Sequence, residues 1–124
     1  ATGRPRRVGP IDLVATRYGC RIQGATEVAL TKLDVLSYMK EIPVCTQYEV
    51  NGEKTDDFPF TAVIDEAKPV LTTVPGWGCD ISGVRKYEEL PQAARDYVEY
   101  VEQAIGVHIS YVSVGAGRDE IIYR

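Results

Sequence analysis

Three arginines, Arg4, Arg6 and Arg7, stand close together in the opening segment ATGRPRR of an otherwise acidic chain. Guanidinium groups are permanently charged and pair through two parallel hydrogen bonds with phosphate or carboxylate groups. Gly3 allows the backbone to approach a ligand closely. The segment therefore suits a clamp for a small anionic ligand. The alternative is an ordinary solvated basic stretch.

A second segment with chemical potential is Thr31-Lys32-Leu33-Asp34, which directly follows an apolar stretch. Guanine carries an N1–H and an exocyclic amine side by side, and one carboxylate can accept a hydrogen bond from each, whereas adenine lacks this pair of donors. The stem of a lysine can lie along the plane of the base. The pattern T-K-x-D therefore indicates a guanine reader with Asp34 as its acceptor. Because the pattern is short, an ordinary surface strand end is the alternative.

Ser113-Val114-Gly115 ends another apolar stretch and could pack backbone amides against a base or ribose, or could be a simple strand-to-turn transition. His108 is the single histidine, so we expect it to have a structural or surface role and expect no metal site. The sequence contains no G-x-x-x-x-G-K, so we expect no cradle for a triphosphate in this chain.

Composition limits the possible partners and compartments. The chain has 124 residues, 44% of them hydrophobic and 26% charged, with a net charge of −4. These values fit one domain, or one piece of a larger domain, and argue against nucleic acid as a partner. No apolar run approaches the roughly 20 residues that span a bilayer, and no signal segment opens the chain.

The three cysteines are widely spaced, and their number is odd. This usage predicts free thiols in a reducing, cytoplasmic environment. The chain does not begin with methionine and opens within a candidate functional loop, so we expect a piece of a longer protein.

Periodicity predicts an α/β fold with a mixed sheet, flanking helices and an antiparallel hairpin. Asn51-Gly52 is the hairpin turn, because both positions tolerate positive φ. The apolar stripe of the first helix is expected to include Tyr18 and Ile22, and that of the second to include Val98 and Val101. The predicted helices cover residues 10–23 and 91–104, a short helical turn covers 35–39, and the predicted strands cover 27–33, 41–50, 53–60, 68–74, 107–114 and 119–123.

The order of the segments resembles the C-terminal portion of the adenylosuccinate synthetase family over essentially the whole chain. The segments that carry the resemblance are TGRPRRVG, ALTKLDVL, EIPVC-x-x-YE with its NG turn, PGW, ELP, IGV, ISYVSVG and RDEII. The resemblance implies that residues 1–124 form a single piece at the C-terminal end of a larger P-loop-NTPase-like ligase domain. It further implies a cytoplasmic homodimer in the full-length protein.

The family joins IMP and L-aspartate, with GTP as co-substrate and Mg²⁺ as cofactor, to give adenylosuccinate, GDP and phosphate. The resemblance places the phosphate loop, the Mg²⁺ site and the catalytic aspartate and histidine in an N-terminal part that this chain lacks. We therefore expect no catalytic residue here, no ligase activity from the chain alone, and no nucleic acid or membrane partner. A stand-alone, non-catalytic guanine-nucleotide-binding module is the alternative function, and a plain structural domain is a further one.

The family roles fall on three segments of this chain. The aspartate- and IMP-binding positions implied by the resemblance are Thr2, Gly3, Arg4, Pro5 and Arg6, of which Arg4 also contacts IMP and Arg6 is shared with GTP. The implied guanine-side positions are Lys32, Leu33, Asp34, Ser113, Val114 and Gly115.

Overall fold

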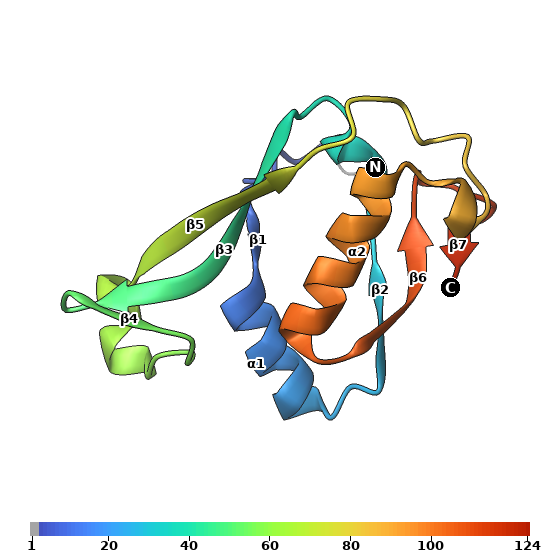
Figure 1. Cartoon of the computed structure of the whole chain (residues 1–124). Coiled ribbons are helices and arrows are strands. Elements are labelled where there is room, and N and C mark those ends of the chain that lie inside the picture. The colour runs from blue at the N-terminus through green and yellow to red at the C-terminus, as the bar shows by residue number, and fades with distance from the viewer. Residues whose placement is uncertain (1–2) are drawn as a thin grey trace.

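The computed structural model describes residues 3–124 and contains two mixed sheets packed with two α-helices (Figure 1). The first sheet contains β1 (Ile11–Asp12), β3 (Glu41–Val50), β4 (Glu53–Thr55) and β5 (Lys68–Pro75). The second sheet contains β2 (Glu27–Leu30), β6 (His108–Ser113) and β7 (Ile121–Tyr123). The helices are α1 (Leu13–Gln23) and α2 (Gln92–Ile105), and the 3₁₀ turns are η1 (Leu33–Leu36), η2 (Thr61–Glu66) and η3 (Tyr87–Glu89). The predicted α/β class with a mixed sheet is confirmed.

In the second sheet, β6 is the central strand, pairing in parallel with β2 and antiparallel with β7. In the first sheet, β3 pairs in parallel with β1 and antiparallel with β4 and β5. The long β3–β5 ribbon extends away from α2 and carries β4 and η2 at its far end (Figure 1). Asn51 and Gly52 both have positive φ, 53° and 83°, which confirms the predicted hairpin turn.

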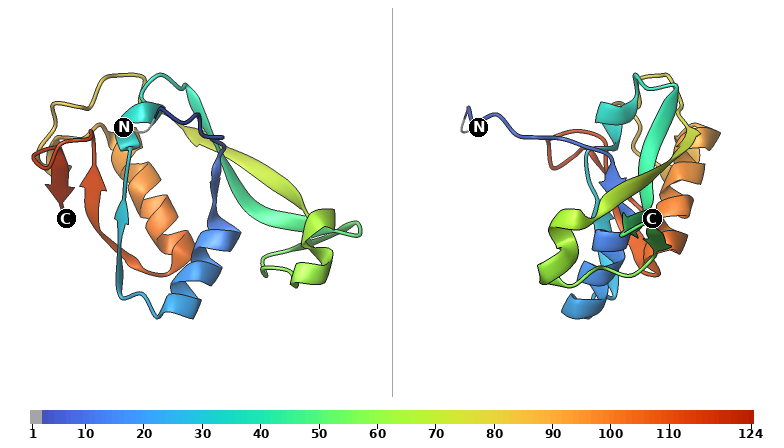
Figure 2. Two further views of the ribbon diagram at one scale, coloured as in Figure 1. Left: turned by 180° about the vertical axis from the view of Figure 1, so that it is seen from behind. Right: turned by 90° about the vertical axis from the view of Figure 1, so that its left-hand side faces the viewer.

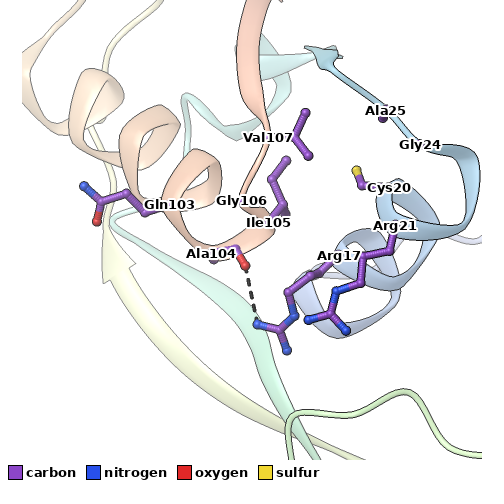
Figure 3. Close-up of a pocket in the computed structure, with 10 residues that line it drawn as sticks. All are labelled: Arg17, Cys20, Arg21, Gly24, Ala25, Gln103, Ala104, Ile105, Gly106 and Val107. Carbon is purple, nitrogen blue, oxygen red and sulfur yellow. Dashed lines mark hydrogen bonds between the residues drawn. The ribbon is translucent and has the colours of Figure 1, made fainter.

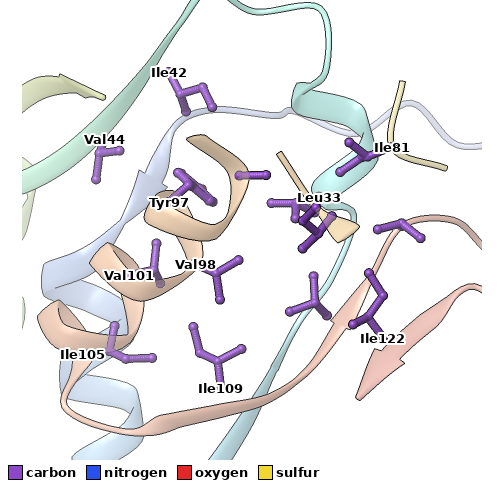
Figure 4. Close-up of a cluster of buried hydrophobic side chains, with 14 of the residues drawn as sticks. Leu33, Ile42, Val44, Ile81, Tyr97, Val98, Val101, Ile105, Ile109 and Ile122 are labelled. Atoms are coloured by element: carbon purple, nitrogen blue, oxygen red, sulfur yellow. The ribbon is translucent and has the colours of Figure 1, made fainter. Parts of the chain in front are cut away.

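The core lies between α2 and the strands around it (Figure 4). The buried residues of α2 are Ala94, Tyr97, Val98, Val101 and Ile105, which are the predicted apolar stripe of this helix. From β6, Ile109 and Val112 are fully buried against this stripe, and Leu33 enters from η1. Each fully buried aliphatic side chain of this size stabilises the fold by about 1.5–3 kcal/mol. The core therefore ties η1 to the helix and the sheet.

The prediction for the first helix is wrong at its start and in its buried face. The helix begins at Leu13, because Asp12 adopts an extended conformation and caps it by accepting a hydrogen bond from Ala15 N at 2.9 Å. Residues 11–12 form β1 instead. Leu13 and Val14 are buried, whereas Ile22 is 69% exposed. The helix therefore packs mainly through its first turn, Cys20 also contacts the core, and residues 21–23 are exposed.

Asp12 also joins α1 to the first sheet. Its Oδ2 accepts a hydrogen bond from the Tyr48 hydroxyl of β3. Burial, followed by the hydrogen bond to the Asp12 carboxylate, raises the pKa of Tyr48 well above its ordinary value. The Tyr48 hydroxyl therefore stays protonated and donates to Asp12 at all physiological pH values.

We expect Asp12→Ala to lower the free energy of unfolding by about 2 kcal/mol, because the helix loses its cap and the half-buried Tyr48 hydroxyl loses its acceptor. Urea denaturation followed by circular dichroism measures this change. Tyr48→Phe is the matched control, since it leaves the cap in place, and its cost should be clearly smaller. Equal effects of the two substitutions would show that the cap contributes nothing.

A second polar cluster fastens the C-terminal end to α2. The Glu102 carboxylate accepts hydrogen bonds from both Nη atoms of Arg124, and His108 Nδ1 lies 2.9 Å from Glu102 Oε2. The backbone N–H of Ile109 donates to the same oxygen at 2.8 Å. The hydrogen bond from Arg124 is the main cause that lowers the pKa of Glu102 below its ordinary value of 4.5. His108 thus has the structural role that the sequence predicts.

A lowered pKa in the folded state means that the unfolded state binds a proton at Glu102 more readily than the folded state does. The stability from this cluster is therefore complete above pH 4.5 and is lost as the pH falls through the folded-state pKa. We expect Glu102→Gln to destabilise the protein at neutral pH, with the difference from wild type shrinking below that value. Urea denaturation at several pH values measures it, with the exposed Glu88→Gln as control. A difference independent of pH would contradict the ion pair.

Cys20, Cys45 and Cys79 are all free thiols. In the part of the chain that the structure describes, no helix is long and apolar enough to cross a membrane.

Candidate functional site

The candidate site lies where the two parallel strands β2 and β6 end at the same edge of the second sheet. Leu30 of β2 is paired with Val112 of β6, so the segments that follow these residues leave the sheet side by side. In open α/β sheets, ligands bind beyond the carboxyl ends of the strands. The segments 31–34 and 113–115, which are separate in the sequence, are therefore neighbours at an edge suited to ligand binding.

A direct hydrogen bond joins these two segments. The backbone N–H of Lys32 donates to Ser113 Oγ at 2.9 Å. Lys32 has a φ of 62°, in the left-handed region, and this turn of the backbone starts η1 at the next residue. The Lys32 side chain itself is exposed and free to lie along a ligand. Ser113 therefore helps to set the conformation from which the Lys32 side chain and the Asp34 carboxylate project.

Leu33 and Asp34 have different roles in the η1 turn. The Leu33 side chain is 1% exposed and anchors the turn in the core, so its role toward a ligand would be through the backbone. Asp34 lies in the first turn of η1, and its Oδ1 is buried without a hydrogen-bond partner within residues 3–124. A buried acceptor without a partner costs about 1–3 kcal/mol. A bound group that donates hydrogen bonds would remove this cost.

The position of Asp34 distinguishes it from other buried polar atoms. Arg95 Nε and Ser110 Oγ also lack partners among the described residues, but they lie within α2 and β6. Asp34 lies in η1, two residues after Lys32, whose backbone N–H donates to Ser113 Oγ at the strand-end edge. A carboxylate can accept two neighbouring donors, and guanine N1–H with the exocyclic amine stays the predicted pair.

The loop from Val114 to Glu120 follows β6 at the same edge of the sheet as η1. Val114 N donates to the Glu120 carbonyl at 2.9 Å, and Gly117 N donates to Glu120 Oε2 at 2.6 Å. A Cβ at Gly115 would lie 2.3 Å from Glu120 Cδ, so only glycine leaves room for this carboxylate. Glu120 holds the loop in shape and was not predicted from the sequence. An acidic residue shortly after a glycine-rich turn was the available signal.

The arginine segment is not brought into this site by contacts. Residues 3–10 are exposed and run out from the body of the protein as an extended segment (Figure 2). Gly3 has a φ of 64°, as the expected close-approach role allows. Within residues 3–124, the guanidinium groups of Arg4 and Arg6 take part in no hydrogen bond or ion pair. Thr2 lies outside the described residues. The binding roles of Thr2, Gly3, Arg4, Pro5 and Arg6 therefore stay predictions.

A cavity of about 570 Å³ lies elsewhere, between the C-terminal ends of α1 and α2 (Figure 3). Arg17 and Arg21 line it together with Cys20. Arg17 already donates to the carbonyl oxygens of Asp56 and Ala104, at 2.7 and 3.4 Å. None of the predicted site residues lines this cavity, and the Arg17 guanidinium is committed to the backbone. The cavity is therefore not the candidate site.

Metal binding is not supported by the donor groups of the described residues. Among residues 3–124, no cluster of three or more His, Cys, Asp or Glu could hold a metal ion. Mg²⁺ prefers several oxygen ligands in octahedral geometry, which the single carboxylate of Asp34 does not supply. We therefore derive no step for Mg²⁺ from the residues of this chain.

The fold and the site define a class of protein: an α/β chain whose candidate ligand site lies at the carboxyl ends of two parallel strands. A family model described as adenylosuccinate synthetase matches residues 1–122. The chain belongs to the adenylosuccinate synthetase family, as its segment order suggests.

Relatives support the same assignment. Adenylosuccinate synthetase from Mycobacterium sp. (strain KMS) is 48% identical over 124 residues, covering 99% of this chain and 29% of the relative. The enzyme from Corynebacterium efficiens is 49% identical over 122 residues, covering 98% of this chain and 28% of the relative. The fully ligated Plasmodium falciparum adenylosuccinate synthetase structure superposes with a TM-score of 0.92 at 33% identity, covering 99% of this chain and 30% of that chain. This chain thus spans less than a third of the length of these relatives.

Proposed function

We propose that this chain is the guanine-reading and aspartate-binding part of a GTP-dependent ligase that joins IMP and L-aspartate to form adenylosuccinate in AMP biosynthesis. The observation that carries the proposal is the buried Asp34 Oδ1, which has no partner in the described chain and lies at the shared end of β2 and β6. Membership of the family supports the proposed reaction, and the site geometry supports the assignment of guanine reading to this chain.

In this proposal, Asp34 accepts hydrogen bonds from guanine N1–H and from the exocyclic amine. The Lys32 stem lies along the base, and Leu33 fixes the turn from below. Ser113, Val114 and Gly115 form the facing wall, in which the backbone amides contact the base or ribose. A base without the two donors would leave the Asp34 carboxylate unpaired, which is the source of specificity for GTP.

The arginine segment would act on the other substrates. Thr2, Gly3, Arg4, Pro5 and Arg6 hold the carboxylates of L-aspartate, Arg4 also contacts IMP, and Arg6 is shared with GTP. The exposed arginines are available for this role, since no described acidic group occupies Arg4 or Arg6. Phosphoryl transfer is catalysed mostly by positioning of the substrates and by charge neutralisation, and guanidinium groups can provide both.

The remaining machinery belongs, in this proposal, to an N-terminal part of the same protein. That part supplies the phosphate loop, the Mg²⁺ site, and the catalytic aspartate and histidine. Mg²⁺ supplies charge neutralisation on the phosphates of GTP. In the reaction, GTP phosphorylates the oxygen on carbon 6 of the IMP base. The amine of L-aspartate then displaces this phosphate. We propose that the full-length protein acts as a cytoplasmic homodimer.

The native length of the protein in its source cells tests the proposal, together with an assay of the isolated chain. An immunoblot against residues 1–124 should detect a protein several-fold longer than this chain. The isolated chain should form no adenylosuccinate, because the phosphate loop is not part of it. A native protein of 124 residues would instead favour a stand-alone guanine-nucleotide-binding module. Adenylosuccinate formed by the isolated chain would contradict the proposed division of roles.

A further inference from the structure

The segment that follows β5 is in direct backbone contact with Met39 and Lys40, between the end of η1 and the start of β3. Gly76 N donates to the carbonyl oxygen of Lys40 at 2.8 Å. A Cβ placed on Gly76 would lie 2.0 Å from the carbonyl oxygen of Met39 and 3.0 Å from its carbonyl carbon. Both are backbone atoms, which cannot move aside as a flexible side chain can. Only glycine at position 76 therefore allows its backbone to lie this close to the backbone of Met39 and Lys40.

Trp77 continues the same contact with its side chain. Its indole Nε1 donates to Ser37 Oγ at 3.1 Å. Its ring packs edge-on against Tyr97 of α2, with the ring centres 5.9 Å apart. Tyr97 is buried in the core, and burial raises its pKa to about 12. The Trp77 ring is thus held on one side by the core and reaches the η1 turn on the other.

Ser37 passes this contact on to Asp34. Ser37 is the C-terminal cap of η1, and its backbone N–H donates to the Asp34 carbonyl oxygen at 3.1 Å. A single residue, Ser37, therefore contacts the Trp77 indole through its hydroxyl and the Asp34 carbonyl oxygen through its backbone N–H. The route from the core to Asp34 consists of two hydrogen bonds.

A turn of this kind needs support from its surroundings. A 3₁₀ helix of four residues has poor hydrogen-bond geometry and little stability of its own. Its start at Lys32 also requires a left-handed backbone, which is costly for a residue with a side chain. Leu33 fixes the turn from the core side, Trp77 contacts it at its cap Ser37, and Gly76 contacts the backbone of Met39 and Lys40 just beyond it. Binding groups must be held to within about 0.5 Å of their productive position.

We infer that Trp77, acting through Ser37, is a positioning residue for guanine recognition, with Gly76 providing the close backbone approach that brings the indole to Ser37. The inference rests on the proposed function, because it assigns Trp77 a role in the site that Asp34 forms. It adds a specificity determinant in a segment that the guanine-reading pattern does not contain. When the Trp77–Ser37 contact is lost, we expect the hydrogen bond from the guanine exocyclic amine to Asp34 to weaken most, since it depends on the orientation of the carboxylate.

The test uses the full-length ligase and compares GTP with ITP, which keeps N1–H and lacks the exocyclic amine. Trp77→Phe retains an aromatic ring against Tyr97 and removes the N–H donor. Ser37→Ala removes the acceptor. Each should raise the KM for GTP about fivefold, as the loss of one hydrogen bond predicts, with kcat changed less than about twofold. The ratio of kcat/KM for GTP to that for ITP should fall in both variants.

Two further measurements separate positioning from general destabilisation. The double variant should cost little more than either single variant, because both substitutions break the same hydrogen bond. Val101→Ala leaves a cavity in the same core, so it should lower the Tm without changing the GTP-to-ITP ratio. If Trp77→Phe fails to fold, Ser37→Ala alone carries the test, since it removes only one oxygen.

Two results would overturn the inference in distinguishable ways. If Ser37→Ala and Trp77→Phe leave both the KM for GTP and the GTP-to-ITP ratio unchanged while Asp34→Asn shifts the preference from GTP to xanthosine triphosphate, the guanine site stands and the positioning role of Trp77 fails. If Asp34→Asn also leaves the nucleotide preference unchanged, the proposed function itself fails, and the positioning role fails with it.

Discussion

Asp34→Asn in the full-length protein is expected to exchange GTP for xanthosine triphosphate as the better nucleotide. Xanthine has a carbonyl oxygen where guanine has its exocyclic amine. An asparagine amide can accept from N1–H and donate to that oxygen, whereas it places its own N–H groups against the guanine amine. We expect kcat/KM for GTP to fall about 100-fold, because a buried, charge-assisted pair is lost. Steady-state kinetics with both nucleotides measures the exchange.

Asp65→Asn is the matched control for this exchange. Asp65 is an exposed aspartate in η2, at the far end of the β3–β5 ribbon, so the same chemical change there should leave both nucleotides unaffected. Unchanged GTP kinetics in Asp34→Asn would favour a plain structural role for this segment. A loss of GTP use without any gain for xanthosine triphosphate would show that Asp34 supports the fold of the site rather than the reading of the base.

Arg4→Ala is expected to raise the KM for L-aspartate about 100-fold, because a bidentate guanidinium–carboxylate pair contributes about 3 kcal/mol. The guanidinium of Arg4 is exposed and has no partner within residues 3–124, so its loss should cost little stability. Arg4→Lys keeps the charge without the planar fork and should recover only part of the affinity. Initial rates at varied L-aspartate concentration give the KM for L-aspartate of the full-length wild-type protein and of the Arg4→Ala and Arg4→Lys variants.

Arg21→Ala provides the control for Arg4→Ala, because Arg21 is also an exposed arginine but lies in the last turn of α1. Its KM for L-aspartate should match that of the wild-type protein. An unchanged KM in Arg4→Ala would indicate that the opening segment is an ordinary solvated basic stretch, which was the alternative interpretation of its sequence.

The elements predicted best were those in which local pattern and tertiary packing agree. The stripe of α2 has five apolar positions on one face, and all five are buried. The Asn51-Gly52 turn formed because its backbone conformation is available to few other residue pairs. The binding roles of segments 31–34 and 113–115 stay predictions, and the parallel pairing of β2 with β6 shows that the two segments leave the sheet side by side.

The errors arose where tertiary contacts override a local pattern. The first helix was expected to bury Tyr18 and Ile22, but its packed face begins at Leu13 and Val14 and continues through Arg17, which donates to the carbonyl oxygens of Asp56 and Ala104. In β3, Val44 and Cys45 are both buried next to a register shift between Cys45 and Gln47, so the strand departs there from strict alternation. A strand alternation rule cannot show where such a bulge falls.

The supporting residues of the site were the hardest to find from the sequence. Trp77 could have been a packing anchor or a loop cover, and its contact with Ser37 depends on the path of the chain after β5. Glu120 fills the space that Gly115 leaves open, which no spacing rule predicts. Residues that position a site through long-range contacts leave no periodic signal in the sequence.

The most direct test of the central claim is the nucleotide preference of adenylosuccinate formation by the full-length protein. Rates with IMP and L-aspartate are measured with GTP, ITP and ATP in turn. A site in which Asp34 reads both donors of guanine predicts the highest kcat/KM for GTP, a value at least about tenfold lower for ITP, and no measurable use of ATP. Equal use of ATP and GTP, or no adenylosuccinate with any of the three, would contradict the claim that this chain is the guanine-reading part of the ligase.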